Sequence, residues 1–225
     1  MVVQHNLSAM NTNRQMGVVT SALQKSTEKL SSGYKINRAA DDAAGLSISE
    51  KMRSQIRGLN KASSNAQDGI SAIQTAEGAL NEAHSILQRM NELATQSAND
   101  TNTTADRTAV QSEVNALTNE LSRIASTSQF NTQNLLDGTF TGKNLQVGAL
   151  ENQKITISIG NMNAKALGVD SLDVKSFTKA GSAMTLIQKA ISKVSGQRSD
   201  LGALQNRLEH TVNNLDNISE NTQTA

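Results

Sequence analysis

One apolar repeat constrains the fold of this chain more than any other feature, because it runs from about Ala43 to Asn99 without a break. Its positions are spaced alternately by four and three residues, the spacing of a helix face that packs along another helix. The chain contains no proline, so no residue of that kind interrupts the helix. The repeat predicts one helix over about 43–99, a rod on the order of 80 Å long. Apolar residues occupy most but not all of its positions, which are Met52, Ile56, Leu59, Ser63, Ala66, Ile70, Ile73, Glu77, Leu80, His84 and Leu87.

Two further long helices and a looser N-terminal one follow from the same spacing. The run of Asn, Asp and Thr over 99–104 is typical of a turn, and a strict repeat then predicts a helix over 105–127 that folds back antiparallel. A last helix is predicted over about 182–223. Residues 1–30 have a looser helical spacing that ends near Gly33. The apolar positions of the two later helices are Val110, Val114, Leu117, Leu121 and Ile124, and then Ile187, Ile191, Val194, Leu201, Leu204, Leu208, Val212, Leu215 and Ile218.

A short segment between these helices has a different period. Residues 154–160, KITISIG, alternate apolar and polar side chains, which indicates a half-buried strand. Residues 144–149 are its expected partner in a β-hairpin over about 144–160. The predicted fold class is therefore mainly α: a long antiparallel coiled-coil-like helical bundle with a small β-hairpin element.

The composition favours thin rods and excludes several classes of function. Aromatic residues make up 2% of the chain, and Asn, Gln, Ser and Thr account for 85 of its 225 residues, so a thick globular core is not expected. The formal net charge of +1 lacks the basic excess of a nucleic-acid binder or of a protein that binds anionic membranes. No apolar run is long enough to span a membrane. We expect neither a nucleic-acid partner nor a membrane partner.

The chain offers no constellation that supports catalysis. It has no cysteine, which excludes thiolate metal sites and cysteine nucleophiles. Its three histidines, His5, His84 and His210, are isolated in sequence, and no Gly-rich phosphate loop follows a strand. Glu209-His210 lacks the histidine three positions before Glu209 that an inverted zinc-protease motif requires. We therefore predict no enzyme activity, no cofactor and no metal site.

Three glycines within the first long helix leave two readings open. Gly58, Gly69 and Gly78 each weaken a helix by roughly 1 kcal/mol relative to alanine. They are either tolerated defects or positions where another part of the backbone comes close. The sequence does not distinguish between the two.

Several blocks of the chain resemble bacterial flagellins, the subunits of the flagellar filament, and the resemblance covers nearly the whole chain. Each block alone is a weak signal, but their order and spacing together are highly specific. The blocks are KLSSGYKINR (29–38), DDAAGL (41–46), QDGI (67–70), QTAEGAL (74–80), QFN (129–131), LLDG (135–138) and QRSDLGALQNRL (197–208).

The resemblance implies a division of the chain and a route of export. Residues 1–42 would be an N-terminal inner-tube arm and spoke, and residues 43–225 an outer-tube helical module. The stretch 132–178 is too short for a projecting variable domain, so a minimal flagellin is expected. Partners would be other copies of the chain, export chaperones, and cap and junction proteins. Without a recognisable signal peptide, export by the flagellar type III apparatus to an extracellular filament is implied.

Flagellins usually continue beyond the position of Ala225 with a helix that pairs with the N-terminal one. On this comparison the C-terminal inner-tube helix is missing here. We therefore expect the apolar stripe of residues 1–30 to be uncovered in a single subunit.

The segment 88–94, QRMNELA, carries the candidate binding site. Met90 and Leu93 are expected to continue the apolar stripe, while Arg89 lies off it and is expected near Leu93 or Glu92 on a solvated face. The segment also resembles the flagellin patch that an innate immune receptor of animals, Toll-like receptor 5, recognises. Carried over by position, that patch comprises Gln88, Arg89, Leu93, Gln96 and Glu113.

The predicted function is structural: a subunit that self-assembles into the flagellar filament for motility. A hook-filament junction protein is the main alternative, because such proteins share the terminal helices. A signalling coiled coil or another helical binding module is a further alternative, although the inserted hairpin disfavours an uninterrupted coiled coil.

Overall fold

The computed structural model describes residues 6–224 and divides them into two compact units between Gln55 and Ile56. The predicted boundary after residue 42 falls at the start of α2 (Ala43–Ser97), earlier than this division. The physical reason is that α2 buries no side chain before Leu59, so its first turns take no part in the core of the second unit.

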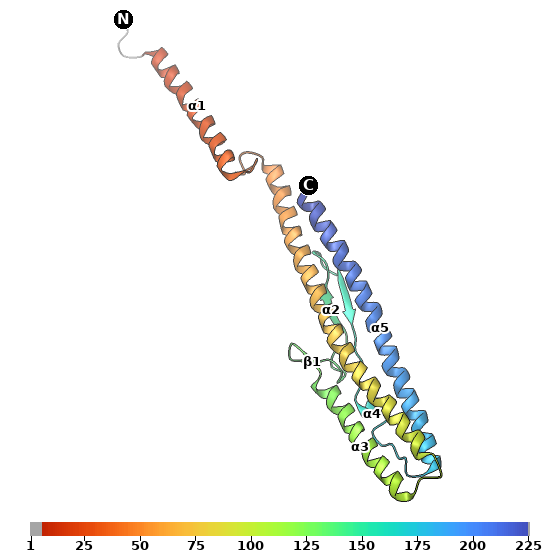
Figure 1. Cartoon of the computed structure of the whole chain (residues 1–225). Coiled ribbons are helices and arrows are strands. Elements are labelled where there is room, and N and C mark those ends of the chain that lie inside the picture. Colours follow the sequence, from red (N-terminus) through yellow and green to blue (C-terminus); the bar gives the residue numbers. More distant parts are fainter. Residues whose placement is uncertain (1–5, 225) are drawn as a thin grey trace. The chain divides into compact units, whose positions relative to one another are not determined.

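The first unit contains α1 (Leu7–Ser32) and the first turns of α2 (Figure 1). The side chain of Asn6 caps the N-terminus of α1 by accepting a hydrogen bond from the Ala9 amide. Gly33 ends the helix with a φ of 73°, a left-handed conformation that glycine adopts without strain. This confirms Gly33 as the helix terminator. None of the side chains of α1 is buried.

The second unit is built from three long helices. It contains the rest of α2, then α3 (Thr104–Thr127) and α5 (Phe177–Thr224) (Figure 1). The predicted helices over 43–99 and 105–127 agree with α2 and α3 to within about a turn. The predicted start of the last helix near residue 182 was late, because its first turns are buried through the small residues Ala180 and Ala183, which a search for large aliphatic side chains does not detect.

Contacts between distant residues show that α5 runs antiparallel to α2 within this unit. Near one end of the pair, the Ser63 hydroxyl donates to the Asp216 carboxylate at 3.0 Å. Toward the other end, the Thr95 hydroxyl lies 3.3 Å from the sulfur of Met184. Low residue numbers on α2 therefore face high numbers on α5.

Two pairs of short strands follow α3 in the chain and precede α5. β3 (Lys143–Gln146) pairs antiparallel with β4 (Lys154–Ile157), in register Leu145 with Ile155. This hairpin falls within the predicted range, and the burial of Ile155, Ile157 and Ile159 confirms the period of two. A second strand pair, β1 (Gln129–Phe130) with β2 (Gln133–Asn134), was not predicted. A short helix, α4 (Ala164–Leu167), precedes α5.

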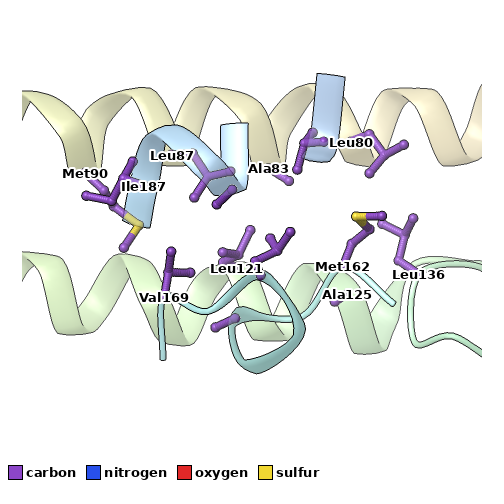
Figure 2. Close-up of a cluster of buried hydrophobic side chains, with 14 of the residues drawn as sticks. Leu80, Ala83, Leu87, Met90, Leu121, Ala125, Leu136, Met162, Val169 and Ile187 are labelled. Carbon is purple, nitrogen blue, oxygen red and sulfur yellow. The ribbon is translucent and has the colours of Figure 1, made fainter. Parts of the chain in front are cut away.

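The core is one large elongated cluster of aliphatic side chains, with a second small cluster of Leu59, Ala62 and Leu215 near the end of the chain. Figure 2 shows Leu87 and Met90 of α2 meeting Leu121 of α3 and Ile187 of α5, with Val169 from the segment before α5 filling the same layer. All five side chains are buried. This continuous packing accounts for most of the apolar burial in the second unit.

The two readings of the helix glycines both apply, at different positions. A Cβ added at Gly69 would collide with the Leu145 side chain of β3, and one added at Gly58 would lie 2.9 Å from the Cβ of Ala149. These two glycines let the hairpin approach α2 closely. Gly78 has nothing within 4 Å and is a tolerated defect.

Between residues 6 and 224, none of the helices combines the length and apolar character needed to cross a membrane. Over the same range, His, Asp and Glu side chains form no group of three that could hold a metal ion.

Candidate functional site

The candidate site is centred on Arg89, which joins α2 to α3 on the surface of the second unit. Its guanidinium donates through Nε and Nη2 to one carboxylate oxygen of Glu113 on α3, at 3.1 and 2.9 Å. A third bond runs from Nη1 to Glu92 at 3.1 Å. The hydrogen bonds to Glu113 first, and then to Glu92, raise the pKa of Arg89, so the guanidinium stays charged.

The side chains of Arg89, Glu92 and Glu113 are accessible to another molecule. The side chains of Arg89 and Glu113 are 51% and 46% exposed. Exposed ion pairs of this kind contribute little to stability. The arrangement holds one positive group between two negative ones through charge-assisted hydrogen bonds.

The other predicted site residues have different environments. Gln88 and Gln96 are exposed on α2, and the Gln88 amide nitrogen lies 3.0 Å from Nε2 of His84. Leu93 is a core residue with 1% of its surface exposed. The stripe prediction is thus confirmed for Met90 and Leu93. Of the patch residues carried over by resemblance, Leu93 therefore lies beneath the surface, where α3 and α5 pack over that face of α2.

A buried amide on α3 was missed by the sequence analysis. The Nε2 group of Gln111 donates to the Leu172 carbonyl at 2.8 Å, and its Oε1 accepts from the Val174 amide at 2.7 Å. The Ser97 hydroxyl of α2 donates to the Val174 carbonyl. These bonds fix the segment before α5 across the ends of α2 and α3. Nothing local in the sequence signals this role, since the partners lie about sixty residues away.

The half of the α2–α5 contact nearest the end of the chain is held by polar side chains. The Ser219 hydroxyl donates to the Asn60 side chain at 2.8 Å, beside the bond from Ser63 to Asp216. Farther along, Arg198 forms an ion pair with Glu77 at 3.5 Å. Leu59, Ala62 and Leu215 form a separate small buried apolar cluster at this end, so both hydrogen bonds and apolar packing hold the seam there.

His84 occupies the polar seam position that the repeat gives it. His84 is half-buried on α2, and its Nε2 atom contacts the side-chain amide of Gln88. This agrees with a polar member of a helix seam. The structure brings no second histidine or carboxylate to it that would make a group of three within residues 6–224.

Two family profiles match the chain. The profile described as the bacterial flagellin N-terminal helical region matches residues 3–141, and that of the bacterial flagellin C-terminal helical region matches residues 184–225. Together they cover α1 to α3 and most of α5.

Individual relatives agree with these profiles. A flagellin of Halalkalibacterium halodurans is 55% identical over 227 positions, which cover all of this chain and 84% of that protein. The flagellar filament 31.3 kDa core protein of Treponema maltophilum is 49% identical over 241 positions, with the same coverage. The crystal structure of Bacillus cereus flagellin superposes with a TM-score of 0.59 at 32% identity, covering 68% of this chain and 88% of that one.

Proposed function

This chain belongs to the bacterial flagellin family, and we propose a division of labour within it for building the flagellar filament. Members of the family are structural subunits of that extracellular filament and are not an enzyme class, so the function of the chain is structural. In the proposal, residues 1–42 are the inner-tube arm and spoke, and residues 43–225 are the outer-tube module. We assign no catalytic step to either part.

The observation that carries this division is the contrast in burial between α1 and the second unit. The apolar side chains of α1 include Met16, Val19 and Leu23, each about two-thirds exposed. A helix that exposes such side chains needs a partner to cover them. In the filament, helices of neighbouring inner-tube arms supply that cover. The second unit, in contrast, has its own buried core.

Seeded growth tests the proposal. Filament fragments of the H. halodurans flagellin are mixed with this chain, and elongation is followed by electron microscopy. The chain is extended at its C-terminus with the C-terminal helix of the H. halodurans flagellin as a partner for α1, and this extended chain is the unaltered chain of the test. We expect elongation by it and none by a variant with Met16→Ser and Leu23→Ser. The matched control carries Gln15→Ser and Gln24→Ser on the same helix. Equal growth of both variants would contradict the role of α1, and no growth of the unaltered chain would contradict the filament role itself.

Export and capping follow as parts of the same proposal. The subunit passes the flagellar type III apparatus unfolded, held by an export chaperone, and joins the filament beneath cap and junction proteins. The absence of cysteine and the low aromatic content support a chain that unfolds without covalent constraint. A pulse-chase measurement in a strain lacking the type III apparatus should find the chain retained in the cytoplasm. Release into the medium by that strain would contradict the route.

A second part of the proposal concerns the surface around Arg89. We propose that Gln88, Arg89, Gln96 and Glu113 contact Toll-like receptor 5, with Leu93 supporting the helix from beneath. The exposed guanidinium held by Glu113 supports this, because arginine side chains held at the centre of a polar patch are frequent binding hot spots.

A binding measurement with a matched control tests the receptor surface. Arg89→Ala should weaken binding of the receptor ectodomain by about tenfold or more. Arg123→Ala is the control, because Arg123 forms a similar exposed ion pair with Glu120 on α3 outside the proposed surface. Equal affinity of the Arg89→Ala protein and the unaltered chain would remove the receptor contact from the proposal.

A further inference from the structure

An apolar groove opens beside the hairpin of the second unit. Its volume is about 240 Å³, and its walls include Ala72 of α2, Phe130 of β1, and Phe140 and Leu145 near and on β3. Two charged residues, Asp68 and Lys143, line it as well, and the ammonium group of Lys143 lies 5.7 Å from the centre of the Phe140 ring. The groove is large enough for one aromatic side chain and has charges of both signs at its border.

An exposed aromatic side chain lies at the other end of the same unit. Phe177 is the first residue of α5 and is 60% exposed. The chain has three phenylalanines, and the other two line the groove. Asp173 and Lys175 lie just before Phe177 in the chain, and Asp173 is paired with Lys179 at 2.6 Å.

Phe177 cannot enter the groove of its own subunit. The groove is at the level of Ala72 on α2, whereas the segment leading to Phe177 is bonded to Ser97 through Val174. These two levels of α2 are about 40 Å apart along the helix axis. If a Phe177 side chain occupies the groove, it must therefore belong to a second copy of the chain.

We propose that Phe177 of one subunit inserts into the groove between α2 and the hairpin of the next subunit. The charges are complementary: Lys175 would approach Asp68, and Asp173 would approach Lys143. Within residues 6–224, neither Asp68 nor Lys175 forms an ion pair in the isolated subunit. Burial of the aromatic ring and pairing of these charges stabilise the same contact.

This contact joins two different surfaces and leaves one of each free on every pair of subunits. Such heterologous contacts add subunits in one direction and produce open filaments when the rotation does not close. The inference rests on the proposed filament function and deepens it by naming the contact that places successive subunits. A reciprocal dimer, with each Phe177 in the groove of the other, would use up both surfaces and stop growth.

Cysteine cross-linking tests the contact directly, because the native chain has no cysteine. The variant Thr178→Cys with Asn144→Cys keeps the aromatic ring and the charges of the contact, and Asn144 lines the groove; grown on seeds and oxidised, it should give a ladder of linked oligomers on a denaturing gel. The control variant, Thr178→Cys with Ser112→Cys on the exposed face of α3, should give none. Linked dimers without higher oligomers, or no links within grown filaments, would overturn the proposal.

A second measurement separates failure of the contact from failure of the function. Phe177→Ala should raise the critical concentration for elongation about tenfold or more, and Phe177→Leu should raise it less. Leu186→Ala, also on α5 and 40% exposed, should leave it unchanged. If Phe177→Ala elongates like the unaltered chain, the contact is wrong while the filament function stands. If the unaltered chain does not elongate, the filament function itself fails.

Discussion

The buried side chain of Gln111 helps to fix the position of the segment before α5. Its amide satisfies a carbonyl and an amide of the segment 172–174 and also donates to Asn115 at 2.9 Å. Buried backbone groups that lose their partner retain the full penalty of leaving water. Gln111 therefore holds the segment before α5 on α3, together with the Ser97 bond and the buried side chains of Leu172 and Val174.

Replacing Gln111 by leucine should destabilise the second unit by about 2 kcal/mol or more, because two buried backbone groups lose their partners. Urea unfolding followed by circular dichroism measures the change. Gln188→Leu on the exposed face of α5 is the control and should shift the free energy of unfolding by less than about 0.5 kcal/mol. A Gln111→Leu protein as stable as the unaltered chain would show that water replaces the amide.

The helix glycines give a second prediction at the same scale. Gly78→Ala should stabilise the protein by about 0.5–1 kcal/mol, since the added methyl group meets no atom and alanine favours the helix. Gly58→Ala should destabilise it instead, because the methyl group would press on both the Cβ and the Cα of Ala149. Thermal unfolding of the two variants should move in opposite directions. A gain in both would show that the hairpin does not need to approach α2 closely.

At the scale of elements, the start of α3 depends on a reciprocal pair of hydrogen bonds. The Thr103 hydroxyl accepts from the Asp106 amide at 3.3 Å, and the Asp106 carboxylate accepts from the Thr103 amide at 2.9 Å. This capping box satisfies two amides that the helix itself leaves free. The hydrogen bonds from the Thr103 hydroxyl first, and from its amide second, lower the pKa of Asp106.

The lowered pKa gives a pH dependence with a definite sign. The contribution of Asp106 to stability is fully present above its unfolded pKa of about 3.9 and is lost as the pH falls through the lower folded value. In urea unfolding between pH 5 and pH 2, Asp106→Asn should therefore lose less stability than the unaltered chain. The loss of stability of an Asp200→Asn variant, changed on α5, is measured over the same pH range as the reference. Equal acid sensitivity of the chain and the Asp106→Asn variant would contradict the role of the cap.

The sequence predicted those elements whose signal is local. The strict spacing of Val110, Val114 and Leu121 was sufficient to predict α3, since large aliphatic side chains at that spacing have no other common structure. The strand pair β1–β2 was missed because its turn uses Asn131 and Thr132 at φ of 46° and 63°, where glycine is the usual signal. The sequence predicted Arg89 near Leu93 or Glu92, and its bond to Glu92 confirms this. Only the resemblance put Glu113 in the same patch, and the ion pair with Glu113 was not predicted, because no local rule places residues of two helices opposite each other.

At the scale of the whole chain, the two units differ in what stabilises them. The second unit holds a continuous aliphatic core from α2, α3 and α5. The helix α1 of the first unit has caps at both ends but no buried side chain. Most of the stability of a helix in a protein comes from tertiary packing of its apolar face. The order of α1 in a free subunit therefore depends on local hydrogen bonds alone.

Hydrogen exchange should show this difference in the free subunit. Amides of α1 are expected to exchange within seconds, whereas those around Leu87 and Leu201, both fully buried, should be protected by orders of magnitude more, approaching the global unfolding limit. In seeded filaments the amides of α1 should become protected, since the proposal has neighbouring arms cover Met16 and Leu23 there. Strong protection of α1 in the free subunit would mean that it does not wait for assembly to become ordered, and would remove the physical basis for its assignment as the inner-tube arm.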